Sequence, residues 1–299
     1  MPPIGRTALW FVAFVISSVA VRDPSMMANG VPVVGPAIGV ALLWLASSDN
    51  WWRDGPVLLA ASAVLGAVNG DDPWLALVGP VAILAVFATV LGLRRWAPDM
   101  WGGGGREPMG TLTQFALLLL LAAVSSAVLV TARVGLGVLL VEGESWSQLP
   151  LRISRSFTSI VALGTVGLLV GGRLVQRADQ GVPLVRATTT RTLELLAISA
   201  LSAAIFVVGF VQHPAVPTTF MLGLAAVWVA VRFGPATTSI VTVALGILAM
   251  ALTMNGYGPV AVITDPAEQA VMAQAFLLAL LVIGMAVSLT RRQLFETIT

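Results

Sequence analysis

The sequence contains no cysteine and no lysine, and its only histidine is His213. The absence of cysteine excludes disulfides, cysteine-ligated zinc, iron–sulfur clusters and a thiol nucleophile. A single histidine excludes a metal site or dyad built from two histidines of one chain. Because His213 precedes Pro214 at the end of an apolar segment, we expect an interfacial loop residue, with a proton relay or pH switch as the alternative. No metal or other cofactor is expected.

Charged residues are scarce as well. They make up 10% of the 299 residues, and hydrophobic residues make up 58%, whereas an ordinary soluble domain carries about 25% charged residues. All 16 basic residues are arginine, and the formal net charge of +2 gives no reason to expect nucleic-acid binding. The composition predicts a polytopic membrane protein with the lipid bilayer as its main partner.

Apolar runs bounded by turn residues or arginines predict ten helical segments. Three of them, 33–47, 56–69 and 217–231, are short for a full span. They either extend into their flanks or insert only partly, which leaves about eight to ten crossings. The expected fold is an all-α polytopic membrane protein. Its ten segments are 7–21, 33–47, 56–69, 74–93, 112–132, 156–171, 193–211, 217–231, 236–254 and 269–289.

The arginines predict the orientation of these segments. If the N-terminus is cytoplasmic, twelve arginines fall in cytoplasmic connections and three, Arg22, Arg152 and Arg155, fall outside, with Arg133 near a helix end. This positive-inside bias places both termini in the cytoplasm, in a multi-pass protein of the bacterial inner (cytoplasmic) membrane. The cytoplasmic set is Arg6, Arg53, Arg94, Arg95, Arg106, Arg173, Arg177, Arg186, Arg191, Arg232, Arg291 and Arg292.

The two ends and the longest connections of the chain also carry predictions. The N-terminal apolar run is expected to be the first membrane helix; a cleaved signal peptide ending at Ser18-Val19-Ala20 is the alternative. Residues 94–111 combine glycine, proline and charge, and are expected to form a flexible cytoplasmic loop. We expect residues 1–290 to form one integral-membrane domain and residues 291–299 to begin a cytoplasmic linker.

Several elements of the first third recur in order in the last third, at offsets between roughly 180 and 200 residues. Segments two to four then correspond to segments eight to ten, and an even shift of six segments preserves orientation. This predicts a parallel repeat, with halves 7–96 and 192–293 around a central pair, 112–171. The matched elements are Val31-Pro32, Trp44, Arg53-Asp54-Gly55-Pro56, Asn69-Gly70 and Pro73 with Val216-Pro217, Trp228, Arg232-Phe233-Gly234-Pro235, Asn255-Gly256 and Pro259.

One group of residues is a candidate binding site for an anionic or polar small molecule. Arg152 and Arg155 lie in or near the connection GESWSQLPLRISR, on the side where arginine is normally rare. With Trp146 and Arg133 they are expected to line an outer vestibule. Two alternatives stay open: charge balance with Glu142 and Glu144, and a snorkelling Arg133 at the membrane interface.

A second candidate ligand site is the glycine-rich turn at Asn255 and Tyr257, which the predicted topology places outside the membrane. Arg232 is expected to be a cytoplasmic anchor.

No carboxylate lies in the middle of a confident segment, which argues against ion-coupled transport and against an intramembrane carboxylate hydrolase. Glu194 is expected to be an interfacial acid at a helix start. The chain itself is therefore expected not to be an enzyme.

Short motifs give the sequence a recognisable pattern. In the second half these are Trp228, Arg232-Phe233-Gly234-Pro235, Gly256-Tyr257-Gly258-Pro259 and Gln274-Ala275-Phe276-Leu277; in the first half, Val34 to Ala41, with Pro36 and Gly39, and Val124-Ser125-Ser126-Ala127. In these motifs the chain resembles the bacterial membrane-associated sensor domain, type one. It departs from that family at SRSFTSIVALG, where family members often have aromatic residues and an acid, so a ligand role for that acid is not carried over.

The resemblance implies a sensory input domain. In that family the last membrane helix normally leads to a cytoplasmic histidine kinase, PAS or diguanylate cyclase module, hence to two-component or cyclic di-GMP signalling. The expected partners are an unidentified ligand, a cytoplasmic output module or partner chain and, as one possible assembly, a second copy of the chain. The alternative function is a small-molecule transporter or permease-like component.

Overall fold

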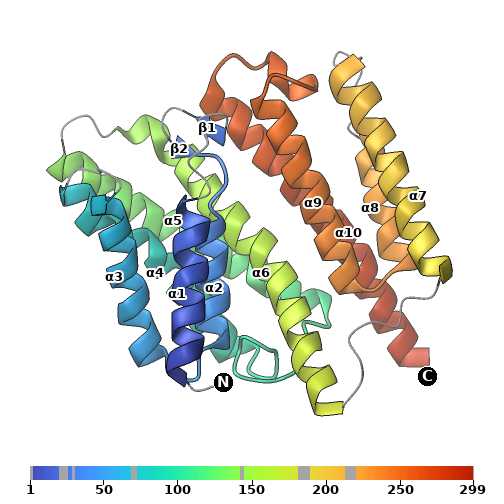
Figure 1. The fold of residues 1–299 in the computed structure, drawn as a ribbon, viewed down its shortest axis with the longest axis horizontal. Helices are drawn as coiled ribbons and strands as arrows, with labels where there is room; N and C mark the ends of the chain where they lie inside the picture. Colours follow the sequence, from blue (N-terminus) through green and yellow to red (C-terminus); the bar gives the residue numbers. More distant parts are fainter. Residues whose placement is uncertain are drawn as a thin grey trace. The chain divides into compact units, whose positions relative to one another are not determined.

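The computed structural model describes residues 3–19, 26–28, 31–68, 73–141, 145–180, 189–212 and 220–298. These ranges contain ten α-helices and one short hairpin (Figure 1), which confirms the all-α prediction. The helices are α1 (Pro3–Val19), α2 (Pro36–Ser47), α3 (Trp51–Val68), α4 (Pro73–Trp96), α5 (Leu112–Leu140), α6 (Leu149–Gln180), α7 (Thr189–Phe206), α8 (Phe220–Arg232), α9 (Pro235–Met254) and α10 (Pro266–Ile298).

Shorter elements complete the described chain. Strands β1 (Met27–Ala28) and β2 (Val31–Pro32) pair antiparallel. A 3₁₀ turn η2 (Trp146–Gln148) precedes α6, a π-helical segment η3 (Val207–Gln212) continues α7, and a 3₁₀ turn η4 (Pro259–Val262) follows α9.

Six helical stretches in the described ranges are long and apolar enough to cross a bilayer, so the chain is a multi-pass membrane protein. Of the three segments predicted to be short, 56–69 extends toward its N-terminus, since α3 begins at Trp51. The other two stay short, because α2 has 12 residues and α8 has 13. The six stretches are Pro73–Trp96, Leu112–Leu140, Trp146–Gln180, Thr192–Gln212, Pro235–Val262 and Pro266–Thr297.

The chain divides into two compact units. Unit 1 comprises residues 1–106 and 116–168, and unit 2 comprises residues 107–115 and 169–299. Helix α6 therefore begins in unit 1, and its last residues belong to unit 2. Most of the predicted central pair, 112–171, groups with the N-terminal helices.

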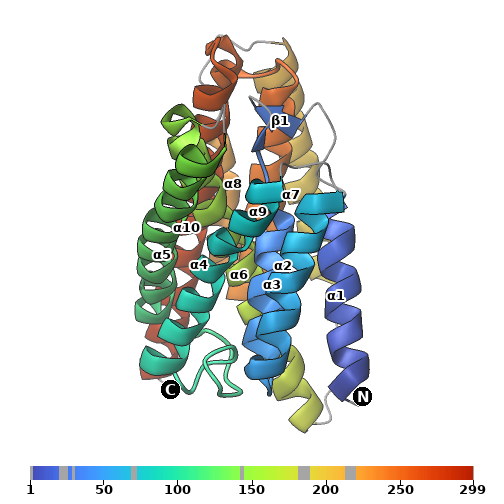
Figure 2. The same cartoon turned by 90° about the vertical axis from the view of Figure 1, so that its left-hand side faces the viewer.

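Close helix packing in unit 1 depends on glycine. Helices α1 to α4 run alongside one another (Figure 2), and α2 meets α6 through small residues. A Cβ at Gly39 would lie 2.3 Å from Leu163, and one at Gly164 would lie 2.6 Å from Leu42. Without side chains at these points the two helices approach closely, as small residues allow in membrane helix pairs.

Unit 2 is built around α10. This helix packs along α9 and α8, and α7 lies beside α8 (Figure 1). Its close approach to α9 again uses glycine, because a Cβ at Gly246 would lie 2.5 Å from Leu277. Phe206, Phe210, Leu222 and Leu280 form part of the buried core.

The helices extend beyond the predicted apolar segments. Helix α5 continues past Arg133 to Leu140, and α6 begins at Leu149, so Arg152 and Arg155 lie in a helix and not in a connection. Charged residues end a hydropathy run but not a helix, because the helix satisfies its own backbone hydrogen bonds whatever the side chains are. Arg53-Asp54-Gly55-Pro56 likewise lies within α3 and does not form a turn between helices.

The connection 97–111 is also different from expectation. It is a compact loop, since Met100 and Met109 are fully buried, and the amides of Gly103 and Gly105 both donate to the carbonyl of Met100. Gly102 and Gly104 have φ angles of 92° and 115°, which favour glycine. The glycine run thus forms a tight turn and not a flexible linker.

Several residues with predicted roles lie outside the described ranges. They are Arg22, Asn69, Gly70, Glu142, Glu144, Arg186, His213, Pro214, Val216 and Pro217.

Candidate functional site

Three arginines predicted to line a vestibule come together in unit 1. Arg152 and Arg155 are three residues apart on α6, which places them on the same side of the helix. Arg155 lies close enough to Arg152 and Arg133 to be affected by their like charges. The cluster therefore joins the second half of α5 to the first turns of α6.

Arg155 is the central member of this arginine cluster. Its Nε atom is buried and has no hydrogen-bond partner among the described residues. Arg152 is held differently, because its Nε and Nη2 donate to Oε1 of Gln148 at 3.1 and 2.6 Å. A buried guanidinium with an unused Nε–H donor favours binding of an anion, since an unmade buried hydrogen bond costs free energy.

Trp146 covers α5 beside this cluster. It lies in η2 and is about half exposed, with 49% of its surface accessible. Its ring rests over Gly135, where a Cβ would lie 3.2 Å from the ring atom Cη2. Trp146 is thus placed to hold η2 against α5 at Gly135, which is two residues after Arg133 in the sequence.

The neighbouring helix surfaces are polar but neutral. Ser126 donates a hydrogen bond to Ser156 at 3.2 Å, and Thr89 pairs with Ser125 at 2.9 Å. No carboxylate of the described residues pairs with Arg155. Glu142 and Glu144, the acids of the charge-balance alternative, lie outside the described residues.

The Arg232-Phe233-Gly234-Pro235 segment joins α8 to α9, and each residue has a distinct role. Arg232 ends α8 and forms an ion pair with Glu194 of α7. Phe233 is buried, and Pro235 occupies the first turn of α9, where proline is favoured. Trp228, one turn before Arg232, is 44% exposed.

Gly234 has a steric reason to be glycine. Its φ of −83° is open to any residue, but a Cβ there would lie 2.7 Å from Nη2 of Arg173. The guanidinium of Arg173 therefore lies directly against the backbone of the turn.

The turn after α9 is explained largely by local structure. The side-chain amide of Asn255 donates to the carbonyl of Ala251, and Tyr257 is 46% exposed. Gly256 and Gly258 have φ angles of 85° and 90°. The amide of Gly258 donates to the carbonyl of Phe210 at 2.9 Å, and Pro259 begins η4. A ligand role for Asn255 and Tyr257 remains a prediction.

Pro36 and Gly39 act within unit 1. Pro36 occupies the first turn of α2, after Gly35, whose amide donates to Oγ of Ser159 at 3.1 Å. Gly39 permits the contact with Leu163 described above. These motif residues therefore position α2 against α6.

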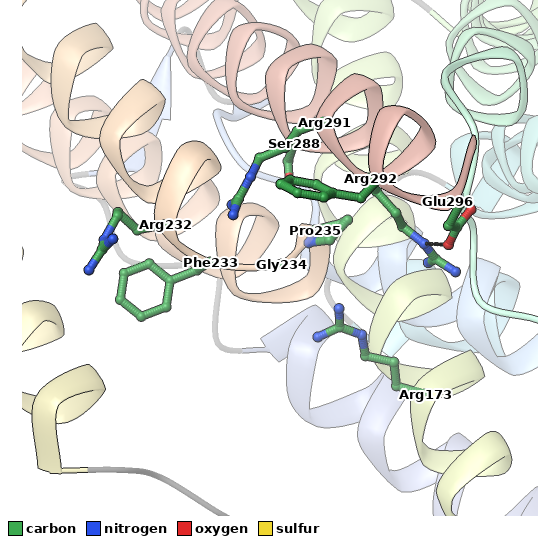
Figure 3. Close-up of a pocket in the computed structure, with 10 residues that line it drawn as sticks. Arg173, Arg232, Phe233, Gly234, Pro235, Ser288, Arg291, Arg292 and Glu296 are labelled. Carbon is green, nitrogen blue, oxygen red and sulfur yellow. Dashed lines mark hydrogen bonds and ion pairs between the residues drawn. The ribbon is translucent and has the colours of Figure 1, made fainter. Parts of the chain in front are cut away.

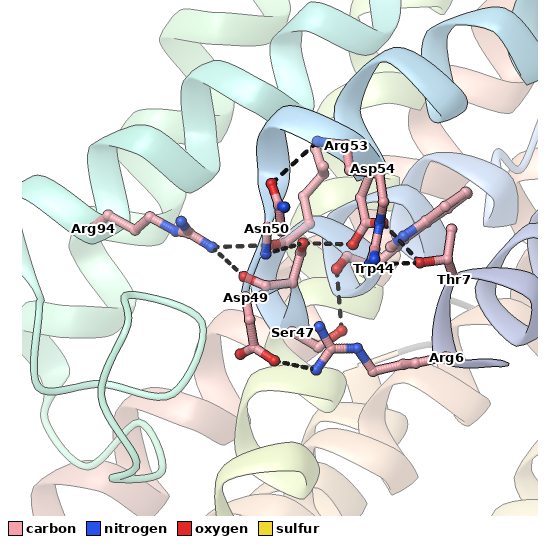
Figure 4. Close-up of polar contacts among 11 residues, drawn as sticks. Arg6, Thr7, Trp44, Ser47, Asp49, Asn50, Arg53, Asp54 and Arg94 are labelled. Carbon is pink, nitrogen blue, oxygen red and sulfur yellow. Dashed lines mark hydrogen bonds and ion pairs between the residues drawn. The ribbon is translucent and has the colours of Figure 1, made fainter. Parts of the chain in front are cut away.

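Sequence reasoning missed a buried carboxylate network at one end of unit 1 (Figure 4). Asp54 is 1% exposed and accepts hydrogen bonds from Ser48 at 2.5 Å, Thr7 at 2.8 Å and Arg53 at 3.1 Å. Burial by itself raises the pKa of Asp54, but the hydrogen bonds from Ser48, Thr7 and Arg53 and the Arg53 charge hold that pKa below its ordinary value.

The same network fixes the end of α2. Arg94 of α4 donates to the carbonyls of Leu45 and Ser48 at 3.2 and 3.0 Å, and Arg6 pairs with Asp49 at 2.8 Å. Cations at a helix C-terminus bind its unsatisfied carbonyls favourably. The adjacent Arg53-Asp54 pair was the only local signal for this network.

The fold and this distribution of charge define a helical multi-pass membrane protein whose arginines gather at particular helix ends. No family model, no curated protein and no solved structure matches the chain.

Proposed function

We propose that this chain is a membrane-embedded sensory input domain that passes a signal through α10 to a cytoplasmic output module or partner. The observation that carries the proposal is the continuity of α10, which runs without a break for 33 residues. A helix of that length spans about 50 Å, whereas the hydrocarbon core is about 30 Å thick. A displacement inside the membrane is therefore transmitted to the residues after Arg291.

The packing of α10 supports this role. Leu277 contacts Gly246, Gly284 faces Thr242, and Ser288 accepts a 3.5 Å hydrogen bond from Thr238. These contacts follow one side of α9 from Thr238 to Gly246. Closely packed helices move as rigid elements between discrete arrangements, and do not bend gradually.

The stimulus in this proposal is an anionic small molecule at the arginine cluster of unit 1. Binding shifts a conformational equilibrium only if the ligand has different affinities for the two states. An anion that pairs with Arg155 meets this condition if the two states differ in how closely α5 and α6 hold Arg133 and Arg155.

The membrane location, the sides of the two termini and the parallel repeat are part of the same proposal. The positive-inside count supports a bacterial inner-membrane location with both termini cytoplasmic. The parallel repeat is supported by similar packing within two helix triplets, since α4 packs against α3 and α2 much as α10 packs against α9 and α8. Sequence resemblance supports coupling to a kinase or cyclase.

The absence of cysteine allows a direct test, because introduced cysteines are the only labelling sites. Ile240 on α9 and Leu294 on α10 are both well exposed. A spin-label pair at Ile240→Cys and Leu294→Cys in liposomes reports their separation by double electron–electron resonance. Adding citrate or sulfate as probe anions is expected to shift the mean distance by about 1–2 Å or more.

The controls separate signalling from transport. Arg155→Gln is expected to abolish the shift, whereas Arg95→Gln, an exposed arginine at the end of α4, is expected to preserve it. An unchanged label distance together with accumulation of citrate or sulfate in proteoliposomes would reject the sensor in favour of a transporter.

A further inference from the structure

An arginine-lined pocket lies entirely within unit 2, at the end where α8 meets α9 (Figure 3). Its volume is about 410 Å³. Four arginines line it: Arg173 from α6, Arg232 from the end of α8, and Arg291 and Arg292 from α10. Among the described residues, Glu296 is the one carboxylate in its wall.

Two of the four guanidinium groups are already neutralised. Arg292 pairs with Glu296 at 2.7 Å, and Arg232 pairs with Glu194. Arg291 donates to a neutral group, the carbonyl of Val231, and stacks over Phe295 with its guanidinium carbon 5.3 Å from the ring centroid. It has no carboxylate partner among the residues described.

Arg173 likewise has no carboxylate partner in the part of the chain that the structure describes. It is half-buried, forms no ion pair with a described residue, and is affected by the like charges of Arg292 and Arg177. Figure 3 shows its side chain reaching from α6 toward the Gly234-Pro235 segment. Positive charges held this close together in a partly buried site are stabilised by an anion.

The start of α9 adds backbone donors to the same pocket. Gly234 and Pro235 line it, and Gly234 is the N-cap residue of this 20-residue helix. Because glycine has no side chain, none caps the first amides of α9. Helix N-termini with unsatisfied amides favour phosphate and other anions.

An apolar groove adjoins the pocket and shares Arg291 and Phe295 with it. The groove has a volume of about 660 Å³ and is otherwise lined by Ala286, Val287, Thr290 and Leu294 of α10. The apolar groove and the cationic pocket thus adjoin each other on α10. An apolar surface beside a cationic site suits an acyl chain and its charged headgroup at the membrane boundary.

The geometry points to a binding site for an anionic phospholipid, with its phosphate among Arg173, Arg291 and the start of α9, and an acyl chain in the α10 groove. Guanidinium groups bind phosphate oxygens through paired hydrogen bonds, and basic pockets between membrane helices bind anionic headgroups. The site does not depend on the sensory role proposed above.

Native mass spectrometry of the purified full chain in detergent tests the assignment, with dioleoylphosphatidylglycerol as the probe and dioleoylphosphatidylcholine as the comparison lipid. The wild type is expected to bind the anionic lipid on the order of tenfold more tightly than the neutral one. Arg173→Gln/Arg291→Gln is expected to lower that affinity by about 10- to 30-fold, since each arginine near a membrane surface contributes on the order of 1 kcal/mol.

Two further variants keep the result interpretable. Arg95→Gln removes an exposed arginine outside the pocket and is expected to bind as the wild type does. If the double glutamine variant fails to fold, Arg173→Lys/Arg291→Lys replaces it, and its affinity is expected to fall between the wild type and the loss predicted above, because lysine keeps the charge but not the paired donors.

A second set of measurements distinguishes a phospholipid headgroup from a soluble phosphate compound as the ligand. Leu294→Glu places a charge at an exposed position of the groove, and is expected to weaken lipid binding several-fold. Glycerol 3-phosphate, the soluble probe, is expected to bind at least tenfold more weakly than the lipid, because it cannot occupy the groove. Glycerol 3-phosphate affinity equal to that of the lipid, or lipid binding unchanged in the arginine variants, overturns the assignment.

Discussion

Ser48 donates a 2.5 Å hydrogen bond to Oδ2 of Asp54, across the turn that joins α2 to α3. Thr7 of α1 and Arg53 donate to the other oxygen of the same carboxylate. Three elements of unit 1 thus depend on one buried negative charge, since Asp54 is 1% exposed.

Asp54→Asn is expected to lower the free energy of unfolding by about 2–4 kcal/mol, because the amide nitrogen cannot accept these hydrogen bonds and Arg53 loses its counter-charge. Thermal unfolding in detergent, followed by size-exclusion chromatography, measures the loss. Asp99→Asn alters an exposed acid in the following loop and should unfold as the wild type does. Equal thermal stability of the two variants would contradict a structural role for the network.

The same carboxylate predicts a dependence on pH. The pKa of Asp54 is lower in the folded protein than its ordinary value, so the ionised form stabilises the fold at every pH above the ordinary pKa, about 3.9. This stabilisation is lost as the pH falls through the lower pKa of the folded state. The wild type should therefore lose stability below about pH 4 more steeply than Asp54→Asn. Parallel acid unfolding curves would refute the assignment.

The contact between Gly39 and Leu163 predicts strong sensitivity to a single methyl group. A Cβ at position 39 would lie 2.3 Å from Cβ of Leu163, so Gly39→Ala should cost about 1–3 kcal/mol by forcing α2 and α6 apart. Gly79→Ala is the matched control, since nothing lies within 4 Å of its Cβ position, and it should be neutral or stabilising by about 0.5–1 kcal/mol. The readout is the thermal unfolding midpoint of each variant.

A second-site change sharpens this test. Leu163→Ala removes Cγ and Cδ1, two of the three Leu163 atoms that the new methyl group would meet, and keeps Cβ, so it should recover part of the stability lost in Gly39→Ala. The double-mutant cycle should then give a coupling energy of about 0.5–3 kcal/mol. Strictly additive effects would show that the two residues do not share a contact.

The helices could be predicted because each contains an apolar run, but their ends could not. Arg133 and Arg152 interrupt the hydropathy pattern, yet the helices continue past both, since intrahelical hydrogen bonds do not depend on side-chain charge. Grouping Arg133 with Arg152 and Arg155 was possible because only a short connection separates α5 from α6.

The remaining contacts join residues far apart in the sequence. Thr7 and Asp54 are 47 positions apart, and Glu194 and Arg232 are 38 apart. No local pattern specifies such pairs, because periodicity indicates which side of a helix is buried but not what it contacts. For the same reason Arg232 was interpreted as a topology anchor alone, although it also pairs with Glu194 and lines a pocket.

Two neighbouring glycines in the turn after α9 should respond differently to alanine. Gly256 and Gly258 both have positive φ angles, so alanine at either position costs about 1–2 kcal/mol of backbone strain. A Cβ at Gly258 would also lie 2.4 Å from the ring of Phe210, whereas Gly256 has open space. Gly258→Ala should therefore have a lower unfolding temperature than Gly256→Ala. The reverse order would mean that the Phe210 contact does not constrain the turn.

Gly234 offers a way to change the pocket of unit 2 with little effect on the fold. A Cβ there would lie 2.7 Å from Nη2 of Arg173, and that atom is the end of a long side chain that can turn away. Gly234→Ala should therefore leave the thermal stability within about 1 kcal/mol of the wild type, as for other substitutions that displace only a mobile side chain. The displaced guanidinium would no longer meet the start of α9.

Phosphatidylglycerol binding should consequently fall by about three- to tenfold in Gly234→Ala, because one charged group leaves the site. Gly223→Ala on α8 is the matched control, since no atom lies within 4 Å of its Cβ position. Titration of each variant by native mass spectrometry provides the comparison. If Gly234→Ala binds the lipid as tightly as Gly223→Ala does, the close approach of Arg173 to the turn has no part in binding, and the glycine serves only the packing of α6 against the start of α9.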